Sequence, residues 1–251
     1  MEAHIHTIPL IDAVTAGDEC PFCFALAKLE EDTVEYTIGT CCSYMEKDVR
    51  AITDKLGFCR HHYGMLWRYE NFLGLAMMTQ TELQAVQEEL AELDPAAPPK
   101  KGLFSRKKAE ESPAAGLVRW ARKRRDTCAV CSHIRQNYSR YLGTFFTMLK
   151  DPEFRKALEE SKGFCLEHFA DVMEAAEEHL PGAYREWFYP TMYRLMEEHL
   201  ARVKGDLDLF IIRHDYKHQN DDPKNSRDAL PRAIEKLGGF HVNRKPYKGR
   251  K

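Results

Sequence analysis

A cysteine and histidine pattern occurs twice in this chain of 251 residues and constrains its fold more than any other feature. Each copy has Cys-x-x-Cys followed by Gly-Phe-Cys-x-x-His, and the two copies are Cys20–Cys23 with Gly57–His62, and Cys128–Cys131 with Gly163–His168. The gap between the second and third cysteines is 35 residues in the first copy and 33 in the second. Such similar spacing indicates an internal duplication, so the chain is expected to fold as two related repeats.

The residue types in this pattern are those that bind zinc. Cys-x-x-Cys and Cys-x-x-His each place two ligands on one face at the start of a helix, and three thiolates with one imidazole form a common closed zinc set. If one helix leads away from each Cys-x-x-Cys and the next returns, the third cysteine arrives beside the first two. We therefore predict two structural zinc sites, one in each half: Cys20, Cys23, Cys59 and His62 in the first, and Cys128, Cys131, Cys165 and His168 in the second.

Alternatives to zinc explain the pattern less completely. Core cysteines or disulfides do not explain why each copy ends in Cys-x-x-His, and an iron–sulfur cluster is a less favoured reading of the same ligands. His61 is a rival to His62 as a ligand, but the second copy has Glu167 at the matching position, which favours His62. Four protein ligands leave no open position for water or substrate, so neither metal is expected to be a catalyst.

The periodicity of the apolar residues predicts an all-α fold, with two zinc-stapled helical repeats forming a helical bundle with long third helices. No stretch alternates as a strand does. In the first half we expect helices from Cys23 to about Gly39, from Ser43 to Leu56, and from Cys59 to Leu93. In the second half we expect them at about 131–149, 152–160 and 165–180, then a long helix through 192–210 and a short one from Asp228 to Gly238.

The small net charge of −2 conceals an uneven distribution. Residues 1–99 carry 6 basic and 17 acidic side chains, and residues 126–240 carry 16 and 20. Residues 100–125 carry 10 basic and 2 acidic side chains, and residues 241–251 carry 5 and none. The chain therefore consists of two acidic bodies, a basic segment between them and a basic tail.

Composition places the domain boundaries around that basic segment. Prolines, small residues and lysines dominate it, and such a composition buries too little apolar surface to fold. We predict a first Cys₃His helical repeat at 1–94, a flexible basic linker at 95–116, a second Cys₃His repeat with a long helix and a C-terminal helix at 117–240, and a basic tail at 241–251.

Several classes of protein are disfavoured. No run of eighteen apolar residues occurs, so no membrane span is expected, and Met1–Val14 lacks the plan of a signal peptide. Cysteine usage then suggests a reducing cytoplasm. The basic linker could contact nucleic acid through phosphates, but two acidic bodies would repel a polyanion, so this partner is not favoured.

Three further groups of residues are candidates for function. The segment His214–Asp222 has two histidines four residues apart, which would share a helix face and could serve as an acid/base group or metal site. Cys41 and Cys42 are adjacent and could sense oxidants, although a simple turn is the plainer reading. Leu230, Ile234 and Leu237 form an apolar stripe that we expect to dock on the bundle, a partner or a second subunit.

The motifs taken together resemble an uncharacterised bacterial family, a domain of unknown function. The resemblance rests on His-Thr-Ile-Pro near the start, Cys-Pro-Phe-Cys, Ser43–Arg50, the two Gly-Phe-Cys-x-x-His motifs and Asn225–Arg232. It covers nearly the whole chain except the linker and tail. It implies a bacterial, cytoplasmic setting but brings no activity, substrate or catalytic residue.

These observations favour a non-catalytic binding or scaffold protein with two structural zinc ions per chain, which acts on a protein partner or on a second copy of itself. An enzyme with a site between the repeats, using the His214–Asp222 segment, is one alternative. A zinc–thiolate redox sensor is the other, because thiolates that bind metal are also oxidisable.

Overall fold

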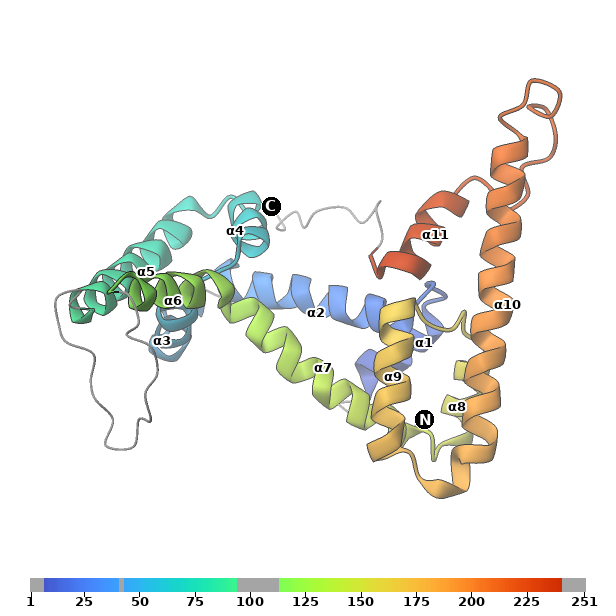
Figure 1. Cartoon of the computed structure of the whole chain (residues 1–251), viewed down its shortest axis with the longest axis horizontal. Coiled ribbons are helices and arrows are strands. Elements are labelled where there is room, and N and C mark those ends of the chain that lie inside the picture. The colour runs from blue at the N-terminus through green and yellow to red at the C-terminus, as the bar shows by residue number, and fades with distance from the viewer. Residues whose placement is uncertain (1–6, 41–42, 94–112, 241–251) are drawn as a thin grey trace. The chain divides into compact units, whose positions relative to one another are not determined.

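The fold is described by a computed structural model for residues 7–40, 43–93 and 113–240. Within these ranges it contains eleven α-helices, two short 3-10 helices and no β-strand (Figure 1), which confirms the all-α prediction. Cys41 and Cys42, the basic tail and the expected linker up to residue 112 lie outside the described residues.

Helices of very different lengths follow one another along the chain. In order they are α1 (Ile8–Thr15), α2 (Pro21–Ile38), η1 (Ser43–Met45), α3 (Lys47–Leu56), α4 (Arg60–Arg68), α5 (Phe72–Glu92), α6 (Pro113–Asp126), α7 (Ala129–Met148), α8 (Pro152–Glu160), α9 (Leu166–His179), η2 (Gly182–Tyr184), α10 (Arg185–Ile212) and α11 (Ala229–Gly238).

Contacts divide the described chain into two compact units that do not follow the halves of the sequence. Unit 1 contains the residues up to Leu29 and those from Gln136 onward, and unit 2 contains the residues from Glu30 to Arg135. We expected the division to fall at the linker, but the boundaries instead fall inside α2 and α7. Each unit is therefore built from both halves, because these two long helices each begin in one unit and end in the other.

Unit 1 has a core rich in aromatic side chains. Phe145, Phe154 and Phe164 are almost completely buried, as are Leu149 and Val172, and the Phe145 ring makes edge-to-face contacts with the other two rings. Edge-to-face ring contacts add to the free energy gained from burial. The core holds the C-terminal part of α7 and the helices α8, α9 and α10 around the start of α2.

Unit 2 has a smaller core in which the end of α2 contributes Val34 and Ile38. Leu66 of α4, Met78 of α5 and Val130 of α7 complete it. Helix α3 packs on α5.

Helix α6 is fastened to α3 in unit 2. Both terminal nitrogens of Arg124 donate to the Asp54 carbonyl at 3.1 Å, and one also donates to the Lys55 carbonyl at 2.6 Å. A guanidinium at this position satisfies carbonyls that the end of α3 leaves without helical partners.

Helix starts predicted from capping residues are confirmed in part. Asp151 caps α8 and accepts from the Glu153 amide at 2.8 Å, with proline at the first position as expected. Ser43, in contrast, begins a short 3-10 helix, and α3 starts only after Glu46. Asp228 precedes α11 as predicted, but the left-handed residue that ends it is Gly239.

The prediction of a single helix from Cys59 to Leu93 is wrong. The structure has two helices, α4 and α5, separated by Tyr69, Glu70 and Asn71. Glu70 has a φ of 66°, and the Asn71 side chain accepts from the Gly74 amide at 3.1 Å. An asparagine at this position caps a new helix, and apolar spacing alone does not reveal the break because it continues through the turn.

Two more helices differ from expectation. Helix α1 occupies a segment for which no helix was expected. Helix α6 begins at Pro113, so it includes the last four residues of the expected linker, and it carries five of the ten basic side chains of residues 100–125. Proline at its first position suits a helix start, because the missing N–H has no helical partner there.

Candidate metal centres

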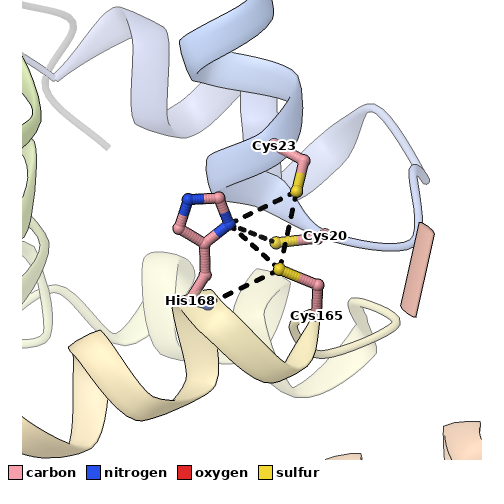
Figure 2. A group of neighbouring side chains, drawn as sticks. All are labelled: Cys20, Cys23, Cys165 and His168. Carbon is pink, nitrogen blue, oxygen red and sulfur yellow. Dashed lines mark hydrogen bonds between the residues drawn. The ribbon is translucent and has the colours of Figure 1, made fainter. Parts of the chain in front are cut away.

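Four potential ligands converge inside unit 1, as Figure 2 shows. Nδ1 of His168 lies 3.4 Å from Sγ of Cys20, 3.3 Å from Sγ of Cys23 and 3.1 Å from Sγ of Cys165. The sulfurs of Cys23 and Cys165 are 3.6 Å apart. We call this group the unit-1 cluster.

A matching group of four lies inside unit 2, and we call it the unit-2 cluster. Its Nδ1 belongs to His62 and lies 3.2 Å from Sγ of Cys59, 3.3 Å from Sγ of Cys128 and 3.4 Å from Sγ of Cys131. The sulfurs of Cys59 and Cys131 are 3.9 Å apart.

The structure brings all eight predicted ligands into these clusters but pairs the motifs differently. We expected each Cys-x-x-Cys to meet the Cys-x-x-His of its own half, and this pairing is wrong. Each cluster joins the Cys-x-x-Cys of one half to the Cys-x-x-His of the other. The reason is the length of α2: its 18 residues extend about 27 Å, so the chain that follows it folds in unit 2 while its first turn stays in unit 1.

The repeated motif has a local structural logic. Gly57 and Gly163 both have positive φ values, 59° and 73°, which residues with a side chain rarely adopt. The cysteine two positions later is the N-cap residue of the next helix, Cys59 for α4 and Cys165 for α9. The histidine then lies in the first turn and points back to the same cysteine, as the short Cys–His distances show.

The spacing of the ligand atoms suits one small ion with tetrahedral geometry. Bonds of about 2.3 Å to sulfur and about 2.0 Å to nitrogen place sulfurs about 3.8 Å apart, and nitrogen and sulfur about 3.5 Å apart. The separations of the ligand atoms in both clusters lie close to these values. No disulfide joins the six cysteines that the described ranges contain. The two groups could therefore each hold a metal ion.

The environments of the two clusters differ in burial. All four unit-1 residues are buried, with Cys20 and Cys165 completely so. Phe22 and Tyr138 pack against the His168 ring, at centroid distances of 5.8 and 5.5 Å. In unit 2, Cys59 and Cys131 are only half-buried.

Proton sharing in the unit-1 cluster follows from its close contacts. Hydrogen bonds from Cys20 and Cys23 lower the pKa of Cys165, and bonds to Cys165 and Cys20 raise that of Cys23. Burial by itself lowers the pKa of His168, but its contacts with Cys165 and Cys20 outweigh this and raise the pKa to about 10. The cluster thus favours a thiolate beside a cation, which is the charge arrangement that a metal ion would replace.

The unit-2 cluster behaves similarly, with an added carboxylate. Burial raises the pKa of Cys128, but the hydrogen bond from His62 and the backbone hydrogen bonds of Cys131 and Cys59 together outweigh it and lower the pKa to about 6. His62 reaches a pKa of about 10 because contacts with Cys128 and Glu30 outweigh the effect of its burial. Nε2 of His62 lies 3.0 Å from Oε1 of Glu30, and exposed His61 contacts the same oxygen at 3.2 Å. A carboxylate behind a ligating histidine fixes its ring and strengthens it as a ligand.

Sequence reasoning missed a buried charge cluster beside the unit-1 cysteines. Glu19, which is 2% exposed, precedes Cys20 and is surrounded by four cationic side chains. The distances to its oxygens are 3.8 Å for Lys162, 2.6 Å for Arg202, 4.0 Å for Arg232 and 3.5 Å for Lys236. Three thiolates with a divalent ion carry a net charge of −1, so this positive environment suits an occupied cluster.

Lys236 links the two ligand-bearing segments through their backbones. Its Nζ donates to the carbonyls of Glu19 and Lys162, both at 2.5 Å, and of Phe164 at 3.4 Å. Burial lowers its pKa, although the charge of Glu19 opposes this. A Lys side chain that is 1% exposed and satisfied by carbonyls fixes α11 over the cluster.

The face of α11 that packs inward is opposite to the one expected. Leu230 and Leu237 are 46% and 64% exposed, while the charged side chains of Arg232 and Lys236 are buried. Burial of the ion pairs described above decides the orientation. A signal was available, because Arg232 and Lys236 lie four residues apart on one face of the helix.

The His214–Asp222 segment does not form a converging site. Helix α10 ends at Ile212, so His214 and His218 lie beyond it and do not share a helix face. His214 contacts the carbonyl of Phe210 at 2.8 Å, and His218 contacts the Asp221 carboxylate at 2.9 Å. Among the residues that the structure covers, no group of three potential metal ligands includes either histidine.

A family model matches nearly the whole chain. Residues 1–244 match a family of unknown function (DUF6062). The chain belongs to this family. No curated protein and no solved structure matches it. In the described ranges, no helix is both long and apolar enough to cross a membrane.

Proposed function

We propose that this chain is a non-catalytic binding or scaffold protein in which one structural Zn²⁺ ion stabilises each unit. The observation that carries the proposal is the presence of two Cys₃His groups whose atoms are spaced as the corners of a tetrahedron around one small ion. Zinc favours this ligand set and this geometry.

The ligand count supports a structural role for the metals. Each cluster supplies four protein ligands, and catalytic zinc usually has three with a water at the fourth position. Each ion would join segments more than 60 residues apart in sequence, so its binding free energy contributes to folding.

The proposed metal identity also rests on the size of the clusters. An iron–sulfur centre contains several irons and bridging sulfides, which separate the protein ligands more than one ion does. In both clusters the four ligand atoms lie within 4.8 Å of one another. This compact spacing favours a single ion.

The outward apolar stripe of α11 supports the proposed binding role. Leu230 and Leu237 project into solvent from a helix whose other face is fixed by buried ion pairs. A fixed helix with exposed leucines suits contact with a protein partner or with a second copy of the chain. We place the protein in the cytoplasm, where a reducing environment keeps thiolates available for metal.

Elemental analysis of the purified protein tests the proposal. We expect two zinc ions per chain, and loss of helical circular dichroism when a strong chelator is combined with mild heating. Iron with visible absorbance would replace zinc in the proposal. Protein without bound metal and with full helicity would overturn it.

A further inference from the structure

The half-buried thiols of the unit-2 cluster form a close pair. Cys59 is the N-cap residue of α4, and Cys131 lies in the first turn of α7, 72 positions later. Their sulfurs are 3.9 Å apart, and both side chains are partly accessible to solvent. Cys128, the third sulfur of the cluster, is 3% exposed.

We propose that Cys59 and Cys131 are a site of oxidative modification at which a peroxide forms a disulfide and displaces the unit-2 metal ion. This inference rests on the proposed function, because it takes the cluster as metal-bound. It assigns different roles to two groups with the same ligand set: a stable centre in unit 1 and an oxidisable one in unit 2.

The chemistry requires only a peroxide and two protons. One thiolate attacks a peroxide oxygen, the O–O bond breaks, and a sulfenic acid and water form after one protonation. The second thiolate attacks the sulfenic sulfur, the S–OH bond breaks, and a second water leaves with the second proton. The two sulfurs lose two electrons in total, the peroxide gains them, and the metal ion leaves because two of its anionic ligands are gone.

Access to solvent, rather than distance between sulfurs, selects this pair. The Cys23 and Cys165 sulfurs are even closer, at 3.6 Å, but both residues are buried. Gly239 at the end of α11 also covers them, since its carbonyl lies 3.3 Å from Sγ of Cys23. Burial and the nearby end of α11 therefore restrict the access of a peroxide molecule to the unit-1 sulfurs.

Closing the disulfide needs a modest movement. The sulfurs must approach from 3.9 Å to a bond length of about 2.0 Å. The two cysteines begin different helices, so rotation of their side chains supplies part of this change once the metal no longer holds them. The bond would close a long loop containing α4, α5 and α6.

Peroxide titration of the metal-loaded full-length chain tests the inference. The experiment uses a Cys41→Ser/Cys42→Ser background, so that the adjacent pair cannot compete for oxidant. Released zinc is followed with a chromophoric chelator, and disulfide-linked peptides are mapped by mass spectrometry. We expect one zinc per chain to be released at low peroxide, with a Cys59–Cys131 linkage, and the second to be retained until at least a tenfold higher dose.

A reductant and added zinc should then restore both the thiols and the metal content. Release of both ions together, or an earlier linkage of Cys23 to Cys165, would overturn the inference while leaving two structural zinc ions in place. Protein that contains no metal before oxidation would instead overturn the proposed function, and with it this inference.

Discussion

The two clusters share their ligand set and differ in what surrounds it. At the middle of Cys-x-x-Cys, unit 1 has Phe22, whose ring stacks near Phe164 and His168, and unit 2 has the smaller Val130. Unit 1 surrounds its thiols with aromatic rings and cations, whereas unit 2 leaves two thiols half-buried and places a carboxylate behind its histidine. The two copies of the motif thus supply the same ligand set in different surroundings.

This difference shows that the choice of metal ion and the strength with which the ion is held depend on different residues. The ligands set which ion is bound, and the surrounding shell sets how firmly it is held and how easily its thiolates react. A buried shell of rings and ion pairs makes unit 1 the more stable of the two units by this argument.

Loss of a metal ligand should have the largest effect on metal content and stability, and the effect should differ between the two units. Cys165→Ser should release the unit-1 metal and melt the large core, because metal binding of about 10 kcal/mol or more is coupled to folding. Cys59→Ser should release one metal from unit 2 and leave the melting of unit 1 unchanged. Metal content and thermal unfolding by circular dichroism measure both effects.

The same variants test the cross-half pairing. With Cys59→Ser, the thiols that gain reactivity toward an alkylating agent should be Cys128 and Cys131, because these share its cluster. Cys20 and Cys23 should stay protected. Reactive Cys20 and Cys23 with protected Cys128 and Cys131 would instead support pairing of the motifs within each half.

Truncation of the ring beside the unit-1 cluster should have the next largest effect. Phe22→Ala removes a side chain that is 1% exposed and contacts four other rings, so we expect a loss of about 4 kcal/mol in the free energy of unfolding. Phe72→Ala is a matched control, because Phe72 is 52% exposed and should cost under about 1 kcal/mol. If urea unfolding showed equal losses of free energy for the two variants, the Phe22 ring would have no special role in the stability of unit 1.

The ligands and most helices could be predicted from the sequence because both depend on local spacing. Cys-x-x-Cys, Cys-x-x-His and the cap at Asp151 act within one turn of a helix, so the sequence alone reveals them. The pairing of motifs could not be predicted in this way. It depends on which unit the chain enters after a long helix. Pairing within each half and pairing between the halves would both give three cysteines and one histidine.

The orientation of α11 shows a second limit of local patterns. An apolar stripe predicts the buried face only when the opposite face has no better partners, and here Glu19 supplies them from more than 200 residues away. The break at Asn71 was missed for a related reason, since one capping side chain interrupts an otherwise continuous apolar periodicity.

Removal of the buried lysine should weaken unit 1 and leave unit 2 intact. Lys236→Met leaves three carbonyls without their donor and takes one cation from Glu19, so we expect a loss of about 3 kcal/mol in unfolding free energy. The matched control is Lys204→Met, whose side chain is 75% exposed in an ion pair with Asp208 and should cost under about 0.5 kcal/mol. Urea unfolding measures both, and equal stability of the two variants would contradict the role given to Lys236.

The smallest effect should come from the carboxylate behind His62. Glu30→Ala removes the acceptor for Nε2 of His62, which we expect to weaken zinc affinity in unit 2 about tenfold without unfolding the protein. Glu30→Gln should lose less, because its amide oxygen still accepts a hydrogen bond. Asp32→Ala, two residues further along α2 and exposed, is the control. Competition with a chromophoric chelator resolves the two ions, and the zinc affinity of the unit-1 cluster should not change.

Two outcomes would contradict this role of Glu30. If Glu30→Ala weakened zinc binding equally at both clusters, or if Asp32→Ala weakened it as much as Glu30→Ala does, Glu30 would act through general charge rather than by orienting His62.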